Sequence, residues 1–114
     1  MSPHLLDREL KRGSLELLIL ALLEERDRHG YDIGKLIEQR SGGQLRFRIG
    51  SLYPMLVRLE DRGYVKGRWV ESETGQRRRY YRLTAKGKKF LAAERLTWEA
   101  FTATVNDIIG IRNA

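Results

Sequence analysis

Several residue types and patterns are absent from this chain of 114 residues, and the absences exclude whole classes of function. The sequence has no cysteine, which excludes disulfides, thiolate zinc sites and cysteine nucleophiles. Its two histidines, His4 and His29, lack the short spacing of a metal-binding pair, so we expect no metal and no other cofactor. The longest apolar run, residues 17–23, is far too short to span a bilayer, and the N-terminus lacks a signal-peptide pattern. We therefore expect a cytoplasmic protein.

Acidic residues are missing from one stretch, residues 76–89, which contains seven basic residues. The whole chain has 22 Lys and Arg against 15 Asp and Glu, so this stretch accounts for the entire net charge of +7. Positive charge concentrated in one place favours binding to a polyanion such as nucleic acid. The alternative is a charge run that only solvates the surface.

Two amphipathic helices are predicted in the first third of the chain. Apolar residues at helical spacing predict a first helix over 5–26. Gly13 is unfavourable inside a helix, so an N-cap at Ser14 is the alternative start, although we favour the longer helix. A second helix is predicted over 31–40, after a polar turn that ends in Gly30.

Residues 44–49 alternate between apolar and polar side chains. This alternation predicts a short extended segment whose apolar side, including Ile49, is buried. Arg46 and Arg48 would then point outward beside the next helix. Both are candidate phosphate contacts.

Pro54 locates a third helix, because proline is best tolerated in the first helical turn. We expect Gly50 or Ser51 to cap this helix, which would run over 51–62. Gly63 is expected to end it.

Period-two patterning returns after the third helix and predicts a hairpin. Its strands are expected over 65–71 and 77–83, which gives a wing over 64–83. Thr84 is expected to cap a last helix over 85–112.

The order helix, helix, extended segment, helix, hairpin predicts a winged helix-turn-helix, a mainly α fold with a small β-hairpin (α+β). In this fold the third helix enters the major groove of double-stranded DNA. Ser51 and Tyr53 are then candidate base contacts, Pro54 is a candidate apolar contact, and Arg58 is a candidate phosphate contact. For Tyr53, packing against the wing or the core is the alternative.

Three consecutive arginines on the returning strand of the wing are further candidate DNA contacts. Successive side chains on a strand alternate, so Arg78 is expected on one face and Arg77 and Arg79 on the other. Arginines near a hairpin tip can straddle a phosphate backbone or enter a minor groove. Tyr80 and Tyr81 are expected to anchor the wing rather than to stack on bases.

Four blocks of sequence, in order, resemble a known family. They are GSLELLILALLEE at 13–25, HGYDI at 29–33, SGGQLRFRIGSLYPMLVRLEDRGYV at 41–65 and GQRRRYYRLTAKG at 75–87. Over nearly its whole length the chain resembles the PadR-like bacterial transcriptional regulators, in the short form with one C-terminal helix. The resemblance implies a homodimeric, nucleoid-associated repressor, which binds an inverted-repeat operator and is often released by a small-molecule effector. It implies no catalytic activity.

We expect a DNA-binding domain over 1–84 and a dimerisation helix over 85–114, packed as one compact unit. Large apolar residues recur at seam spacing in the last helix: Leu91, Trp98, Phe101, Val105 and Ile108. In the family such a seam packs against the second subunit, chiefly its first helix, which would add Leu5 and Leu6 to the interface. Some short members bind flat aromatic compounds between paired tryptophans, so Trp98 is a candidate effector contact. Hydrophobic packing in the seam is the alternative for Trp98.

Two other functions are compatible with parts of this pattern. A winged-helix protein-interaction module without specific DNA binding would use the same fold, but it predicts a neutral or acidic third helix and wing. An enzyme would need a spaced acid–base pair, a nucleophile with a histidine or a glycine-rich phosphate loop, and the sequence has none of these. The basic excess therefore favours a DNA-binding regulator.

Overall fold

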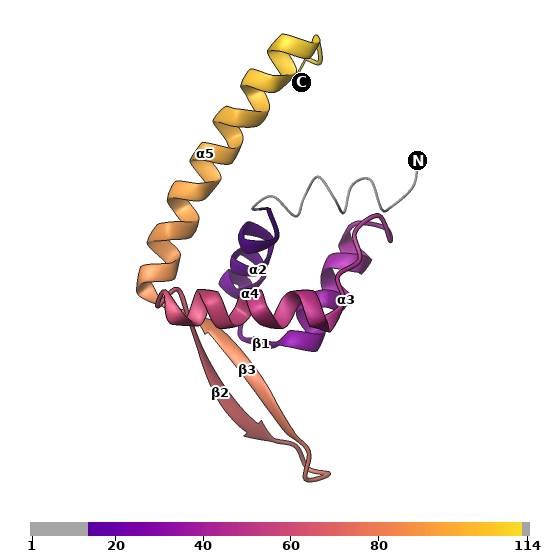
Figure 1. The fold of residues 1–114 in the computed structure, drawn as a ribbon, viewed down its shortest axis with the longest axis vertical. Helices are drawn as coiled ribbons and strands as arrows, with labels where there is room; N and C mark the ends of the chain where they lie inside the picture. The colour runs from indigo at the N-terminus through magenta and orange to yellow at the C-terminus, as the bar shows by residue number, and fades with distance from the viewer. Residues whose placement is uncertain (1–13, 113–114) are drawn as a thin grey trace.

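A computed structural model describes residues 14–112 as helices packed beside a small antiparallel sheet (Figure 1). The elements are α2 (Ser14–Glu25), β1 (Arg28–His29), α3 (Gly30–Arg40), α4 (Ile49–Asp61), β2 (Val65–Glu71), β3 (Arg77–Leu83) and α5 (Ala85–Ile109). The predicted fold class, mainly α with a small β-hairpin, is confirmed. The hairpin extends away from α4 on one side and α5 extends away on the other. In the described range, every helix is too short or too polar to cross a lipid bilayer.

One apolar core joins α2, α3, α4 and the root of α5. Its fully buried aliphatic side chains include Ile19, Leu20, Ile33, Leu56, Leu59 and Leu91. Burial of these side chains is the main force that holds the helices together. The sheet lies beside this core in the order β1-β3-β2, and both pairings are antiparallel.

The segment predicted to be extended over 44–49 joins no sheet, but its predicted alternation is observed up to Arg48: Leu45 and Phe47 pack against the core, whereas Arg46 and Arg48 are exposed. The third strand of the sheet is β1. The Leu45 N–H donates to the Ser41 hydroxyl at 3.0 Å. A nearby side chain, rather than a neighbouring strand, therefore supplies the hydrogen-bond partner of this backbone group. Ile49 is already helical and is 39% exposed, so its predicted burial is wrong.

The predicted cap of the third helix at Gly50 or Ser51 is also wrong. α4 begins at Ile49, with Arg48 as its N-cap, and Pro54 therefore lies inside the helix. The missing N–H of Pro54 leaves the Gly50 carbonyl without its usual donor. Burial of Leu52 and other apolar residues holds this turn in place despite the lost hydrogen bond. The first-turn position of proline is a preference, and packing overrides it here.

The root of α5 is joined to the start of the wing. The Thr84 hydroxyl oxygen accepts the Gly87 N–H at 3.0 Å, which confirms the predicted cap, and it lies 2.6 Å from the Gly63 carbonyl oxygen. A Cβ atom on Gly87 would collide with the Tyr64 carbonyl oxygen. The rings of Tyr64 and Phe90 stack with their centroids 4.1 Å apart. These contacts fix the direction in which α5 leaves the domain.

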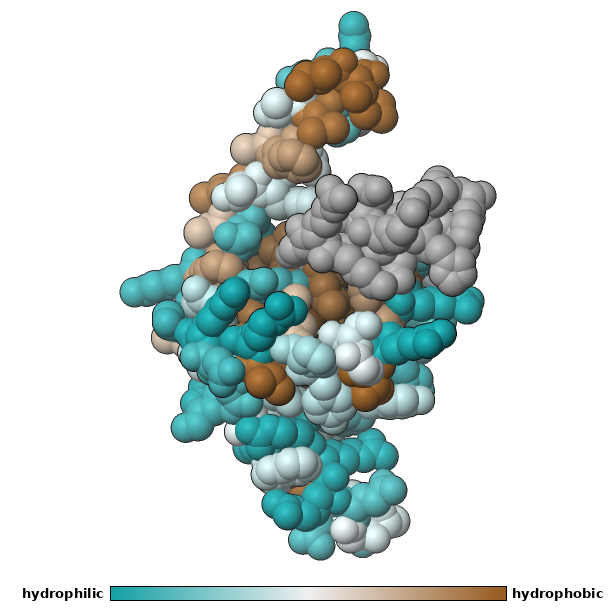
Figure 2. All heavy atoms as spheres, in the orientation of Figure 1, coloured by the Kyte–Doolittle hydropathy of each residue, from teal (hydrophilic) through white to brown (hydrophobic). Residues whose placement is uncertain are grey.

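The assignment of Leu91 to a dimer seam is wrong, because its side chain is 0% exposed in the core of its own protomer. Further along α5, Arg95 pairs with Glu24 of α2 at 2.8 Å. Beyond this ion pair the large exposed side chains of α5 are Leu96, Trp98, Phe101, Ile108 and Ile109. Figure 2 shows apolar surface gathered near the free end of α5. The expected contacts of Leu5 and Leu6 lie outside the described residues.

Leu91→Ala is expected to lower the free energy of unfolding by about 2–5 kcal/mol, because it opens a cavity in a closely packed core. Leu96→Ala, at a 69% exposed position of the same helix, is the matched control and should change the protomer's stability by less than about 0.5 kcal/mol. Urea unfolding followed by circular dichroism, at two protein concentrations, measures both. Equal effects of the two substitutions would contradict the assignment of Leu91 to the core.

Candidate nucleic-acid interface

A cleft of about 550 Å³ lies between the start of α3, α4 and the wing. Its lining residues are His29, Tyr31, Tyr53, Trp69, Gln76, Arg77, Arg78 and Arg79. Aromatic rings and guanidinium groups therefore line one concave surface. This combination suits a sugar-phosphate backbone, because arginine binds phosphate and rings pack against sugars or bases.

The exposed side of α4 continues this surface. Its exposed residues include Ser51, Tyr53, Pro54, Val57 and Arg58, while Leu52, Leu56 and Leu59 face the core. Tyr53 is 40% exposed and lines the cleft together with wing residues, so part of its ring is accessible at this surface. The helix thus presents a mixed polar and apolar face beside the wing.

Ion pairs neutralise some of the arginines that the sequence suggested as phosphate contacts. Arg46 pairs with Glu38 at 3.1 Å, and Arg79 pairs with Glu60 at 3.0 Å. Among residues 14–112, four of the candidates have no carboxylate partner: Arg48, Arg58, Arg77 and Arg78. The positive charge available at this surface is therefore smaller than the sequence count, and it is concentrated at the start of α4, along its exposed side and on the wing.

The three wing arginines alternate in direction as predicted. The guanidinium groups of Arg77 and Arg79 lie over the Trp69 ring, 5.0 and 5.4 Å from its centroid. Arg78 points to the other face, where its Nη1 lies 3.1 Å from His29 Nε2. Contact with a ring face stabilises a guanidinium group without neutralising its charge. Arg77 is therefore held in place and still available to a phosphate.

The two wing tyrosines anchor the hairpin, as expected. Tyr81 is buried, and this burial raises the pKa of its phenol. Tyr80 is half-buried and meets the His29 ring edge to face, with the centroids 5.3 Å apart. Both rings are therefore engaged in packing within the domain.

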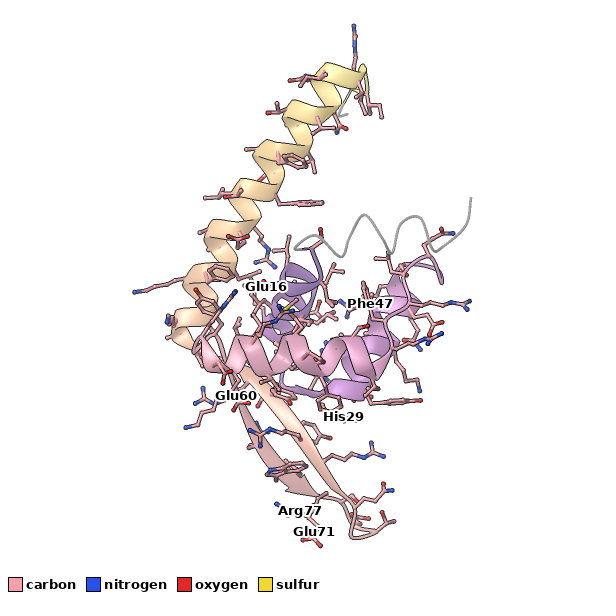
Figure 3. The ribbon with its side chains drawn as sticks, in the orientation of Figure 1. Glu16, His29, Phe47, Glu60, Glu71 and Arg77 are labelled. Atoms are coloured by element: carbon pink, nitrogen blue, oxygen red, sulfur yellow. The ribbon has the colours of Figure 1, made fainter. Side chains whose placement is uncertain are left out.

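Glu60, in the last turn of α4, connects the helix to the base of the wing (Figure 3). Its carboxylate accepts the Gly67 N–H at 3.0 Å and also the Arg79 guanidinium, which raises the pKa of Arg79. A Cβ atom on Gly67 would lie 2.7 Å from the Arg79 side chain, so the joint leaves no room for a larger residue without a shift. Arg79 is therefore part of the joint between helix and wing.

Sequence reasoning missed His29, Tyr31 and Trp69 as parts of this surface. His29 and Tyr31 lie in the HGYDI block. In the sequence this block supports the family resemblance and the start of a helix, and neither of these indicates a surface shared with the wing. Trp69 is paired directly with Arg79 across the hairpin, and the strand register alone would have placed the two together. Glu60 was missed because its role depends on a contact between α4 and both strands.

Three α-helices followed by an antiparallel wing define a winged-helix protein. The model of the transcriptional regulator PadR-like family matches residues 19–93. This chain belongs to the PadR-like family, whose members are transcriptional regulators and not enzymes.

The chain is also similar to solved structures of transcriptional regulators and to one curated relative. A transcriptional regulator from Clostridium thermocellum is 34% identical, with a TM-score of 0.79 over 87% of this chain and 93% of that one. A PadR family transcription regulator from Clostridium difficile is 32% identical, with a TM-score of 0.74 over 85% and 99% of the two chains. An uncharacterised protein X from Lysinibacillus sphaericus is 32% identical over 90% of this chain and 91% of its own length.

Proposed function

We propose that this transcriptional regulator is a homodimeric repressor that binds an inverted-repeat operator in double-stranded DNA. The observation that carries the proposal is the set of exposed arginines without a carboxylate partner, in the described residues, along α4 and the wing. Such a surface attracts phosphates and releases their counterions. A protein-interaction module without DNA binding has no need for this arrangement, and it remains the alternative.

In this proposal the residues divide by task. Ser51, Tyr53 and Pro54, near the start of α4, read base edges in the major groove. Arg48 and Arg58 contact the flanking phosphates. The wing residues Arg77 and Arg78 and, more weakly because of its ion pair, Arg79 bind the next stretch of backbone. Arg46 is paired with Glu38 but largely exposed, so it can still contribute to the field around the DNA.

The second subunit is proposed to cover the free half of α5. The seam then consists of Trp98, Phe101, Val105 and Ile108, while residues 1–84 form the DNA-binding unit. Trp98 and Phe101 have ring centroids 6.2 Å apart and could receive a flat aromatic effector between two subunits. A regulator of this kind works at the nucleoid, in the cytoplasm.

Selection of bound fragments from the source genome, followed by footprinting, tests the proposed function. We expect a protected inverted repeat whose half-sites are one helical turn, about 10 base pairs, or a multiple of it apart. Substitutions of Ser51 or Tyr53 should change the order of preference among the selected sequences. Protection of a single half-site would contradict the dimer, and equal affinity for random DNA at physiological salt would contradict specific recognition.

A further inference from the structure

His29 occupies a nearly closed position between α3 and the wing strand β3, at the edge of the cleft (Figure 3). Its side chain is 8% exposed. The titratable or charged groups around the ring are Asp32 and Tyr31 from α3, Arg78 and Tyr80 from β3, and Tyr53 across the cleft from α4. The ring therefore packs against Tyr31 and Tyr80 and also contacts an arginine of the proposed phosphate-binding set.

One nitrogen of this ring has two competing partners. His29 Nε2 lies 3.0 Å from the Asp32 Oδ2 and 3.1 Å from the Arg78 Nη1. A ring nitrogen either carries a proton and donates, or lacks one and accepts. Without a proton, Nε2 accepts from Arg78, and it makes no hydrogen bond with the Asp32 carboxylate because both atoms are then acceptors. With a proton, Nε2 donates to Asp32 and its N–H faces the N–H groups of Arg78. The two hydrogen bonds therefore exclude each other.

We infer that His29 and Asp32 are positioning residues that hold Arg78 in free protein and release it to a phosphate when DNA binds. This inference rests on the proposed function. In the free protein, Arg78 donates to the unprotonated Nε2. On the DNA, Arg78 donates to a phosphate oxygen instead. The neutral ring changes tautomer by exchange with solvent: Nδ1 loses its proton, Nε2 gains one, and Nε2–H donates to Asp32. Asp32 thus stabilises the DNA-bound arrangement although it carries the same sign of charge as DNA.

The sign of the Asp32 effect separates this inference from simple electrostatics. Removal of an acidic residue beside bound DNA ordinarily strengthens binding, because one repulsive charge is lost. Asp32→Ala is instead expected to weaken operator binding by about 3- to 10-fold for each subunit, the net worth of one ordinary intramolecular hydrogen bond. The matched control is Asp27→Ala, which removes a carboxylate that pairs with Arg68 of the wing at 2.7 Å. The control should leave affinity unchanged or raise it.

Two further measurements test the connection through His29. In an Arg78→Ala background, Asp32→Ala should have no weakening effect, because the two residues act on one process. In a His4→Gln variant, which leaves a single histidine, ¹⁵N NMR of the ring should report a proton on Nε2 only after the selected DNA fragment is added. The NMR readout uses the unaltered Asp32 and Arg78, so it does not depend on the folding of their variants.

The outcomes distinguish this inference from the proposed function. If wild-type protein binds the selected fragment and Asp32→Ala binds it equally or more tightly, the inference is overturned and the proposed function stands. The inference is likewise overturned, and the proposed function stands, if ring NMR shows no proton on Nε2 after the DNA is added. If wild-type protein shows no specific binding to any fragment, the proposed function fails, and the inference fails with it.

Discussion

Replacement of Arg77 and Arg78 by alanine is expected to weaken binding to every DNA sequence, whether specific or not. Both side chains are exposed on the wing and lack a carboxylate partner in the described part of the chain. Each phosphate contact adds about 0.9 to the slope of log affinity against log salt, which is about 8-fold in affinity at about 0.1 M salt. The double substitution should therefore reduce affinity by ~60-fold for each subunit and flatten the salt dependence.

Fluorescence anisotropy with one DNA fragment at several salt concentrations measures both quantities. Arg95→Ala is the matched control, because it removes the same charge from α5, where Arg95 is paired with Glu24. It should leave the slope unchanged. Arg79→Ala should change the slope less than either exposed arginine does, because the Arg79 charge is already compensated by Glu60. A slope unaffected by the double substitution would show that the wing does not contact phosphates.

Phe101→Glu is expected to convert the proposed dimer into monomers. Phe101 is 59% exposed in the protomer and lies on the same face of α5 as Trp98 and Ile108, at helical spacing. Loss of one buried phenylalanine removes about 1.5–3 kcal/mol, and a two-fold interface loses it twice. The dissociation constant of the dimer should rise by about 100-fold or more. Operator affinity should fall with it, because one subunit alone reads only one half-site.

Analytical ultracentrifugation over a range of concentrations measures the dissociation constant. Leu96→Glu is the control, because Leu96 is 69% exposed and lies on the opposite side of α5 from Phe101. It should leave the dimer intact. A Phe101→Glu protein that stays dimeric would contradict the assignment of α5 to the interface. A wild-type protein that is monomeric at micromolar concentration would contradict the dimer itself.

Sequence patterns within short segments predicted the correct first and last residues of some elements. The strands Val65–Glu71 and Arg77–Leu83 and the cap at Thr84 follow from alternation and from a hydroxyl side chain before a helix, and both signals lie within a few neighbouring residues. The start of α4 was misplaced by two residues, because the rule for Pro54 is local whereas the burial that extends the helix is tertiary.

Features that depend on distant partners could not be predicted from the sequence. The β1 strand consists of two residues that pair with β3, more than 40 residues away. The same holds for Glu60, whose carboxylate contacts both wing strands, and for His29, whose partner Arg78 lies on another element. Leu91 had the spacing of a seam, and spacing alone cannot tell whether an apolar face meets its own domain or a second subunit.

The glycine in the first turn of α5 has a mechanical consequence. Gly87 packs directly on the backbone of Tyr64, which follows α4. The first turn of α5 is therefore attached close to the end of α4, and a change of packing at this point would tilt the whole helix. A helix of 25 residues is about 37 Å long, so a tilt of about 10° at the pivot moves its far end by about 6 Å. In a dimer joined through α5, such a tilt would change the distance between the two α4 helices. The spacing of half-sites that the protein accepts would then depend on the packing around Gly87, a residue outside the proposed set of DNA contacts.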